Sequence, residues 1–418
     1  MSCHVIELDF TARFTHNRGH KPCVSLNAST VNRTIEDVVR EPISAIDQNS
    51  ETTTVAPGIA LCLSGGGYRA MTFHLGALIR LNEVGLLMRL NRVSSVSGGS
   101  ITAAQLGLKW RELIFENGVA KNLIELVVEP IRMLGQRTID RGSIIRGILT
   151  PWRTISDYIT RAYSKNLFGG ANLQDLPSDD QGPRFVINST NVQTGALWRF
   201  SKPYMGDYKV GRALNPRTLL ATAVAASSAF PPVLSPLVLN LTGTEFDPDP
   251  KAILQRRPFT THVYLTDGGV YDNLGLETAF KRYKTLLVSD GGGKMAAQDK
   301  PARDWVRHAL RINNVIDNQV RSLRKRQLIA EFQRGAEHDG TYWGIRSHLN
   351  DYPVTTRLAC PQERTEELAA TPTRLKAMEP AYQERLINWG YAVCAAAVES
   401  YFKGPIAAPI NFPFARGV

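Results

Sequence analysis

Long apolar runs are absent from this 418-residue sequence, and its first residues do not predict a secretory leader. No uninterrupted apolar stretch reaches the roughly 18 residues that span a bilayer. The N-terminus, MSCHVIELDF, has acidic residues where a signal peptide needs a basic start and an apolar run. The sequence therefore predicts a cytoplasmic location without a transmembrane segment or Sec export. Peripheral membrane association and specialised secretion stay open.

Paired cysteines are missing as well. The five cysteines are odd in number, widely scattered and without a CxxC pair: Cys3, Cys23, Cys62, Cys360 and Cys394. This pattern argues against a disulfide framework and against a zinc site. We therefore expect a reducing compartment and no metal.

Acidic residues are outnumbered, at 38 against 49 Lys and Arg, which gives a net charge of +11. Such a field favours anionic partners such as acidic lipid surfaces or nucleic acid, and its sign alone does not choose between them. The densest basic run, residues 321–326, precedes Leu328, Ile329 and Phe332 and predicts an amphipathic helix. Its charged face is either ordinary solvated surface or a contact for a membrane or partner.

Hydrophobic residues make up 43% of the chain and charged residues 21%, which are ordinary proportions for a folded globular protein. Short apolar runs that end in glycine or polar residues alternate with helical stretches. This alternation predicts the α/β class, with a three-layer α/β/α domain around a largely parallel central sheet. We assign residues 57–405 to this domain, 1–56 to an N-terminal extension and 406–418 to a C-terminal tail.

The segment Ser95-Val96-Ser97-Gly98-Gly99 is a candidate nucleophile elbow at the end of an apolar run. In such a turn a serine exposes its hydroxyl between a strand and a helix, and the following amides face developing negative charge. Ser95 replaces the first glycine of the usual G-x-S-x-G pattern, and serine is small enough for the bend. The alternative is a tight turn in which Ser97 caps the helix.

A glycine loop, Gly65-Gly66-Gly67, stands between another apolar run and a helical pattern. Consecutive glycines let backbone N–H groups converge on a phosphate or on an acyl oxyanion. The loop lacks the Lys-Ser/Thr of a P-loop and the G-x-G-x-x-G of dinucleotide sites, so an oxyanion hole is the better interpretation. Arg69, which follows the loop, would either bind a substrate phosphate or orient the loop.

Two aspartates are candidates for the base. Asp267 and Asp290 each end an apolar run and precede glycines. The carboxyl end of a strand is where open α/β folds place their sites, whereas an Asp-Gly turn is the structural alternative. Local pattern alone leaves the two nearly equal.

Together these segments resemble the patatin-like phospholipase family. The glycine loop, the Ser97 elbow and Asp267-Gly268-Gly269 occur in the family's order, and residues 225–232, AASSAFPP, look like another of its recurring segments. The resemblance covers roughly residues 57–400. It implies a patatin-like domain that hydrolyses acyl esters of glycerolipids, as a phospholipase A or lysophospholipase, through a Ser-Asp dyad without histidine, metal or cofactor.

Carried over by motif, the resemblance implies Ser97 as the nucleophile, Asp267 as the base and the loop Gly65, Gly66 and Gly67 as the oxyanion hole. It also favours Asp267 over Asp290, because the residues after Asp267 match the family's continuation into a helix. Asp290 is then expected at the sheet edge, near Ser97 but not touching it. The eight histidines are expected to be structural or exposed, with His338 and His348 the least excluded.

The implied partners are a phospholipid or another acyl-ester lipid and a peripheral, anionic membrane surface, with no nucleic acid. Residues 119–153 are unusually apolar and carry five arginines. They would form either a lid or membrane-docking segment or helices that cover the core. Two rival functions stay open, an acyltransferase on the same scaffold and a lipid-binding module without catalysis.

Overall fold

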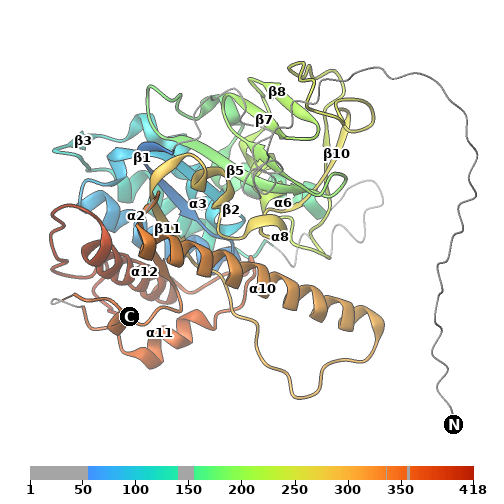
Figure 1. The fold of residues 1–418 in the computed structure, drawn as a ribbon. Helices are drawn as coiled ribbons and strands as arrows, with labels where there is room; N and C mark the ends of the chain where they lie inside the picture. The colour runs from blue at the N-terminus through green and yellow to red at the C-terminus, as the bar shows by residue number, and fades with distance from the viewer. Residues whose placement is uncertain (1–54, 140–154, 336, 355–357) are drawn as a thin grey trace, which may run out of the picture. The chain divides into compact units, whose positions relative to one another are not determined.

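The computed structural model describes residues 55–139, 155–335, 337–354 and 358–418. Within these residues a ten-stranded sheet has the order β12-β11-β1-β2-β5-β6-β7-β8, and β10 joins it at β5 and carries β9 (Figure 1). The expected N-terminal extension lies outside the described residues up to residue 54. The assigned domain boundaries stay predictions.

The strands of this sheet are β1 (Ala56–Leu63), β2 (Leu90–Val96), β5 (Arg184–Asn191), β6 (Ala196–Phe200), β7 (Tyr204–Asp207), β8 (Gly211–Leu214), β9 (Leu237–Asn240), β10 (His262–Asp267), β11 (Tyr283–Asp290) and β12 (Asp339–Gly344). The path β12-β11-β1-β2-β5 is parallel throughout. The other pairings are antiparallel. The predicted parallel sheet is confirmed as the centre of a mixed α/β fold, and an antiparallel extension continues from β5.

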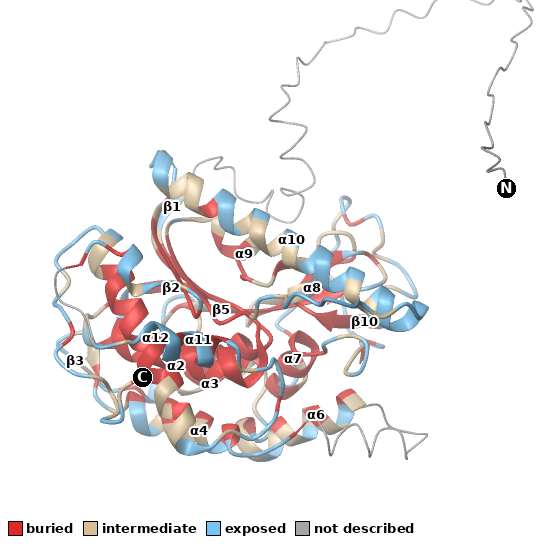
Figure 2. Cartoon of the chain, turned by 90° about the horizontal axis from the view of Figure 1, so that it is seen from below, coloured by how far each residue is buried: buried red, intermediate tan, exposed pale blue. Residues whose placement is uncertain are grey.

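Helices cover both faces of the sheet, as the three-layer prediction requires (Figure 2). They are α2 (Gly67–Glu83), α3 (Gly98–Lys109), α4 (Glu129–Gly135), α6 (Ile155–Tyr163), α7 (Leu220–Ser227), α8 (Gly269–Asp272), α9 (Glu277–Phe280), α10 (Trp305–Arg334), α11 (Gln362–Ala369) and α12 (Pro380–Tyr401). Figure 2 shows α2, α3, α7 and α12 on one side, and α8, α9 and α10 on the other.

The central strand β1 explains the two layers, because successive side chains of a strand point to opposite faces. Leu61 and Leu63 join the large core that contains α2, α3 and α12. Ala60 and Cys62 join a smaller core with residues of α9 and α10. Burial on both faces accounts for the continuous apolar run in the sequence.

Helix α2, which begins in the glycine loop, is fixed by close packing against α12. A Cβ on Gly76 would lie 1.9 Å from the Ile387 carbonyl oxygen, and a Cβ on Gly390 would lie 2.0 Å from that of Phe73. Only glycine permits this backbone approach at both positions. The start of α2 is therefore held rigidly at the sheet edge.

The described part of the apolar segment, residues 119–139, packs as helices over the core. It contains β4 (Val119–Ala120), which pairs with β3 (Phe115–Glu116), a π-helical turn at Ile124–Val128, and α4. Val127, Ile131 and Leu134 are buried in the main core, as in the alternative of core-covering helices. Residues 140–153, the rest of the segment, lie outside the described residues.

The last residues of the chain contact the domain. The Asn388 side-chain amide of α12 donates to the carbonyls of Phe414 and Gly417, and the Val418 side chain is buried. In the part of the chain that the structure describes, no helix is both long and apolar enough to cross a membrane.

Candidate active site

The parallel register brings the loops after three strands to one edge of the sheet. Leu63 of β1 is level with Ser95 of β2 and with Ser289 of β11. Each strand ends within two residues of these positions. The glycine loop, Ser97 and Asp290 therefore meet at the same edge, where parallel α/β sheets place their sites.

Ser97 occupies a sharp turn between β2 and α3, with φ 50° and ψ −118°. A non-glycine residue at positive φ is strained, and such strain persists only where the surroundings enforce it. The Ser97 side chain makes no capping hydrogen bond to α3, so the helix-cap alternative does not describe it. A Cβ on Gly98 would lie 2.1 Å from the Gly67 carbonyl oxygen, which explains the small residue after the serine.

Asp267 reaches Ser97 through an antiparallel pairing that the sequence pattern did not indicate. Strand β10 runs antiparallel to β5 and places Asp267 opposite Ser189. The preceding residue of β5, Asn188, is the register partner of Val96, directly before Ser97. Two strands that run in opposite directions thus bring the serine and the aspartate together.

The Ser97 hydroxyl lies close enough to the Asp267 carboxylate to act on it as a hydrogen-bond donor does. The Gly269 amide donates a hydrogen bond, at 2.7 Å, to Asp267 Oδ1. Burial raises the pKa of Asp267 to about 7, although both donors lower it. A carboxylate in this environment is a much stronger base than one in water.

The glycine loop lies against the turn that holds Ser97. Its amides differ: Gly65 N–H donates to the Asn273 carbonyl at 3.0 Å. Among the described residues no partner is seen for the amides of Gly66 and Gly67, which have φ of 144° and 61°. Two unengaged N–H groups beside a serine suit an oxyanion.

Arg69, in the first turn of α2, is buried and bonded to the chain itself. Its Nε donates to the Gly291 carbonyl and its Nη2 to Thr373 Oγ1, both at 3.0 Å, and its Nη1 donates to the Thr371 carbonyl. These contacts tie the glycine-loop helix to two other loops. Of the two roles left open for Arg69, they support orientation of the loop.

Asp290 lies at the end of β11, in a different setting. Its carboxylate accepts from the Tyr342 hydroxyl and from the Gly292 amide, both at 2.8 Å. Burial raises the pKa of Asp290, but Arg321, Tyr342 and the Gly292 amide outweigh it and hold the pKa below its usual value. No hydrogen bond joins Asp290 to Ser97 within the described residues, as the sequence analysis expected.

Ser227 is a residue of the site to which sequence reasoning gave no role. Its Oγ accepts the Ser97 amide at 2.9 Å and donates to the Asn188 carbonyl at 2.6 Å. Its own carbonyl accepts the Gly268 amide at 3.2 Å. Ser227 therefore braces both the serine turn and the aspartate loop. The only signal in the sequence was its place in the segment at residues 225–232.

No hydrogen bond or ion pair joins a described histidine to Ser97 or Asp267. His74 Nε2 faces the Ser64 carbonyl at 3.0 Å, so it carries the proton, and Nδ1 accepts from Ser289. Burial lowers the pKa of His74 to about 4, so the ring is neutral. His338 Nε2 donates to the Phe280 carbonyl.

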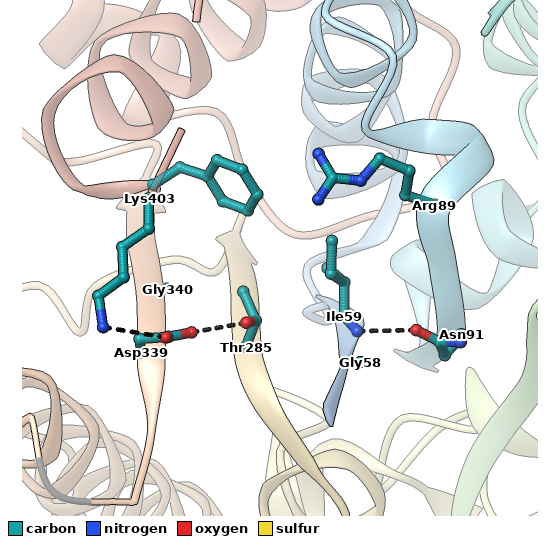
Figure 3. Close-up of a pocket in the computed structure, with 9 residues that line it drawn as sticks. Gly58, Ile59, Arg89, Asn91, Thr285, Asp339, Gly340 and Lys403 are labelled. Carbon is teal, nitrogen blue, oxygen red and sulfur yellow. Dashed lines mark hydrogen bonds and ion pairs between the residues drawn. The ribbon is translucent and has the colours of Figure 1, made fainter. Parts of the chain in front are cut away.

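One cavity and one cluster of residues of metal-ligating types lie away from Ser97. A cavity of about 320 Å³ opens at the amino ends of the parallel strands, opposite the Ser97 edge, and is lined by Arg89, Asp339 and Lys403 among others (Figure 3). Lys403 and Thr285 both contact Asp339 there. Glu331, Glu337 and His338 are a group of metal-ligand types near the end of α10, away from the serine.

Comparison with known proteins gives one family. The model of the patatin-like phospholipase family matches residues 61–280, which is just over half of the chain. No curated protein matches the chain. Similar solved structures include human GIVD cytosolic phospholipase A2, with 14% identity over 86% of this chain and 63% of that one and a TM-score of 0.47. The same protein in complex with methyl gamma-linolenyl fluorophosphonate has 15% identity over 84% of this chain and 60% of that one, with a TM-score of 0.46.

VipD from Legionella pneumophila is also similar, with 14% identity over 81% of this chain and 66% of that one and a TM-score of 0.32. The chain spans about three fifths of the length of the cytosolic phospholipase A2 structures. The family match runs from the last residues of β1 to the end of α9 and includes the glycine loop, Ser97 and Asp267. The chain belongs to the patatin-like phospholipase family.

Proposed function

We propose that this protein is a lipid acyl hydrolase that cleaves acyl esters of glycerolipids, with Ser97 as nucleophile and Asp267 as base. The observation that carries the proposal is the close approach of the Ser97 hydroxyl to a buried carboxylate whose pKa is about 7. A base works best when its pKa lies near the working pH. Family membership supports the same class of reaction.

In the first step Asp267 takes the Ser97 proton as Ser97 Oγ bonds to the ester carbonyl carbon. The carbonyl oxygen becomes an oxyanion, which the amides of Gly66 and Gly67 stabilise. The ester C–O bond then breaks, and the leaving alcohol takes the proton from Asp267. An acyl-Ser97 ester remains.

In the second step water attacks the acyl-enzyme. Asp267 accepts a proton from this water and returns it to Ser97 Oγ as the fatty acid leaves, so the enzyme is restored. The strained serine turn assists both steps, because it fixes Oγ between the carboxylate and the glycine loop.

The neighbouring residues take supporting roles. The Gly65 amide is engaged by Asn273, so Gly65 shapes the loop while Gly66 and Gly67 supply the donors. Arg69 orients the same loop through its three hydrogen bonds. The protein would bind the surface of the substrate membrane as a peripheral protein.

Labelling with a fluorophosphonate, followed by peptide mapping, tests the assignment. We expect a single adduct on Ser97 and none on Ser97→Ala. The nearby hydroxyls are already committed: Ser94 Oγ donates to the Gly275 carbonyl, and Ser100 Oγ bonds Ser95 and Ser227. An adduct on one of these serines, or full ester hydrolysis by Ser97→Ala, would contradict the proposal.

A further inference from the structure

Helix α10 is the most exposed long element of the described chain. Leu328 is its only buried residue among the 30 of Trp305–Arg334. Its C-terminal half packs on the sheet through Leu328, Ile329 and Phe332. Its N-terminal half extends past the other helices on that face, and Figure 2 shows exposed residues along it.

Large apolar side chains form one stripe on this exposed helix. Trp305 is 82% exposed, Ile316 55% and Leu323 57%, and Ile312 is exposed as well. At 100° per residue, the spacings of seven, four and seven place all four within about 40° of one another around the helix axis. We call these four residues the apolar stripe. Such an exposed apolar row usually marks an interaction surface.

The stripe is embedded in the most basic part of the chain. Residues 294–326 contain nine Lys and Arg and three Asp, which accounts for more than half of the net charge of +11. Lys294, Lys300 and Arg326 are exposed and form no ion pair within the described residues. This segment therefore presents apolar and cationic groups together.

The C-terminal half of α10 contacts segments that lie next to the candidate active site. Arg324 donates to the Tyr271 carbonyl and to Glu277, in the segment that follows Asp267. Arg321 Nη1 donates to the Gly293 carbonyl at 2.7 Å. Gly291, two residues earlier, accepts from Arg69. A surface that α10 contacts would thus lie close to the site.

We propose that the apolar stripe of α10 docks on an anionic phospholipid membrane, with its side chains among the acyl chains and the basic residues at headgroup level. Bulky apolar residues beside cations are typical of helices that lie in the membrane interface. A second copy of the chain is a poorer occupant, because two strongly basic segments would be brought together. The choice of a lipid surface rests on the proposed function.

Vesicle sedimentation with matched helix variants tests the docking. Ile312→Asp/Ile316→Asp places two charges in the stripe. Asn314→Asp/Asn318→Asp places the same two charges, at the same spacing, on the opposite face. Both are made in the Ser97→Ala background, so that the vesicles are not consumed.

On vesicles of phosphatidylglycerol and phosphatidylcholine, we expect the isoleucine variant to bind at least about tenfold more weakly than the parent, because burial of even one such side chain is worth about that factor. The asparagine variant should stay within about threefold. Pure phosphatidylcholine should bind the parent more weakly than the anionic mixture does. Equal losses in the two variants, or none, would overturn the proposal.

Two controls separate the alternatives. A dimer of the parent that dissociates in the isoleucine variant without lipid, measured by sedimentation velocity, would mean that a second copy covers the stripe and would refute membrane docking. Hydrolysis of a soluble short-chain ester should be unchanged when the isoleucine pair is replaced in the chain that keeps Ser97. The experiments therefore distinguish a failure of the docking proposal from a failure of the proposed hydrolase activity.

Discussion

The hydroxyl of Ser97 lies next to Asp267, a carboxylate that is buried and has no described cation in hydrogen-bond contact. An ion pair would have lowered the carboxylate's pKa and its strength as a base. Asp290 illustrates the contrast, because Arg321 stabilises its charge. The two aspartates that were nearly equal in the sequence therefore differ in chemistry.

The exchange of each aspartate for asparagine separates the two roles. Asp267→Asn keeps the shape and removes the proton acceptor, so kcat should fall by about 10²–10⁴. Asp290→Asn should cost far less in kcat and should act mainly on stability, because it alters the bonds to Tyr342 and Gly292. A dead Asp290→Asn enzyme beside an active Asp267→Asn enzyme would reverse the assignment.

Activity should rise with pH through the pKa of Asp267. Below about 7 the carboxyl is protonated and cannot accept the serine proton, and above it the base is ready. This rise should appear in the pH profile of kcat/KM for a soluble ester, a substrate that avoids effects of pH on a membrane. A flat profile between pH 5 and pH 8 would argue against Asp267 as the base.

The same shift has the opposite effect on stability. The folded pKa is raised above the usual 3.8, so the folded state holds the proton longer than the unfolded one, and stability falls as pH rises from about 4 to about 7. Asp267→Asn removes this loss, because asparagine does not titrate. The Tm of the variant minus the Tm of the wild type, measured by calorimetry, should therefore be larger at pH 8 than at pH 4.

Ser227→Ala should lower kcat by about tenfold with little change in KM. The variant leaves the buried Ser97 amide without its acceptor and loosens the turn that holds the nucleophile. Ser228→Ala is the matched control, because the Ser228 hydroxyl donates to the carbonyl of Val224 in α7, the helix that ends just before it. Equal effects of the two variants would show that Ser227 does not position Ser97.

Close packing of α2 on α12 makes Gly76→Ala strongly destabilising. The added methyl would meet the Ile387 carbonyl oxygen at 1.9 Å, so the helices must separate, at a cost of at least about 1–3 kcal/mol. Gly170→Ala is the control, since nothing lies within 4 Å of its Cβ position. Denaturant unfolding of both variants checks the difference, and equal midpoints would contradict it.

The sequence predicted those parts of the site that depend on one local segment. A serine or glycines directly after an apolar run are visible in the chain, and the parallel sheet follows from the alternation of strands and helices. The antiparallel direction of β10 was not visible, because pairing partners distant in sequence leave no local pattern. The role of Ser227 was missed for the same reason, since its partners Ser97 and Gly268 belong to other segments.

The order in which the chain is synthesised gives the antiparallel strand β10 a further meaning. Ser97 and its glycine loop come early, on β1 and β2, whereas Asp267 arrives only at the end of β10. A nascent or truncated chain that ends before His262 can carry the proposed nucleophile but not its base. Esterase activity would then report that the domain has finished folding, because it can appear only after β10 has paired with β5.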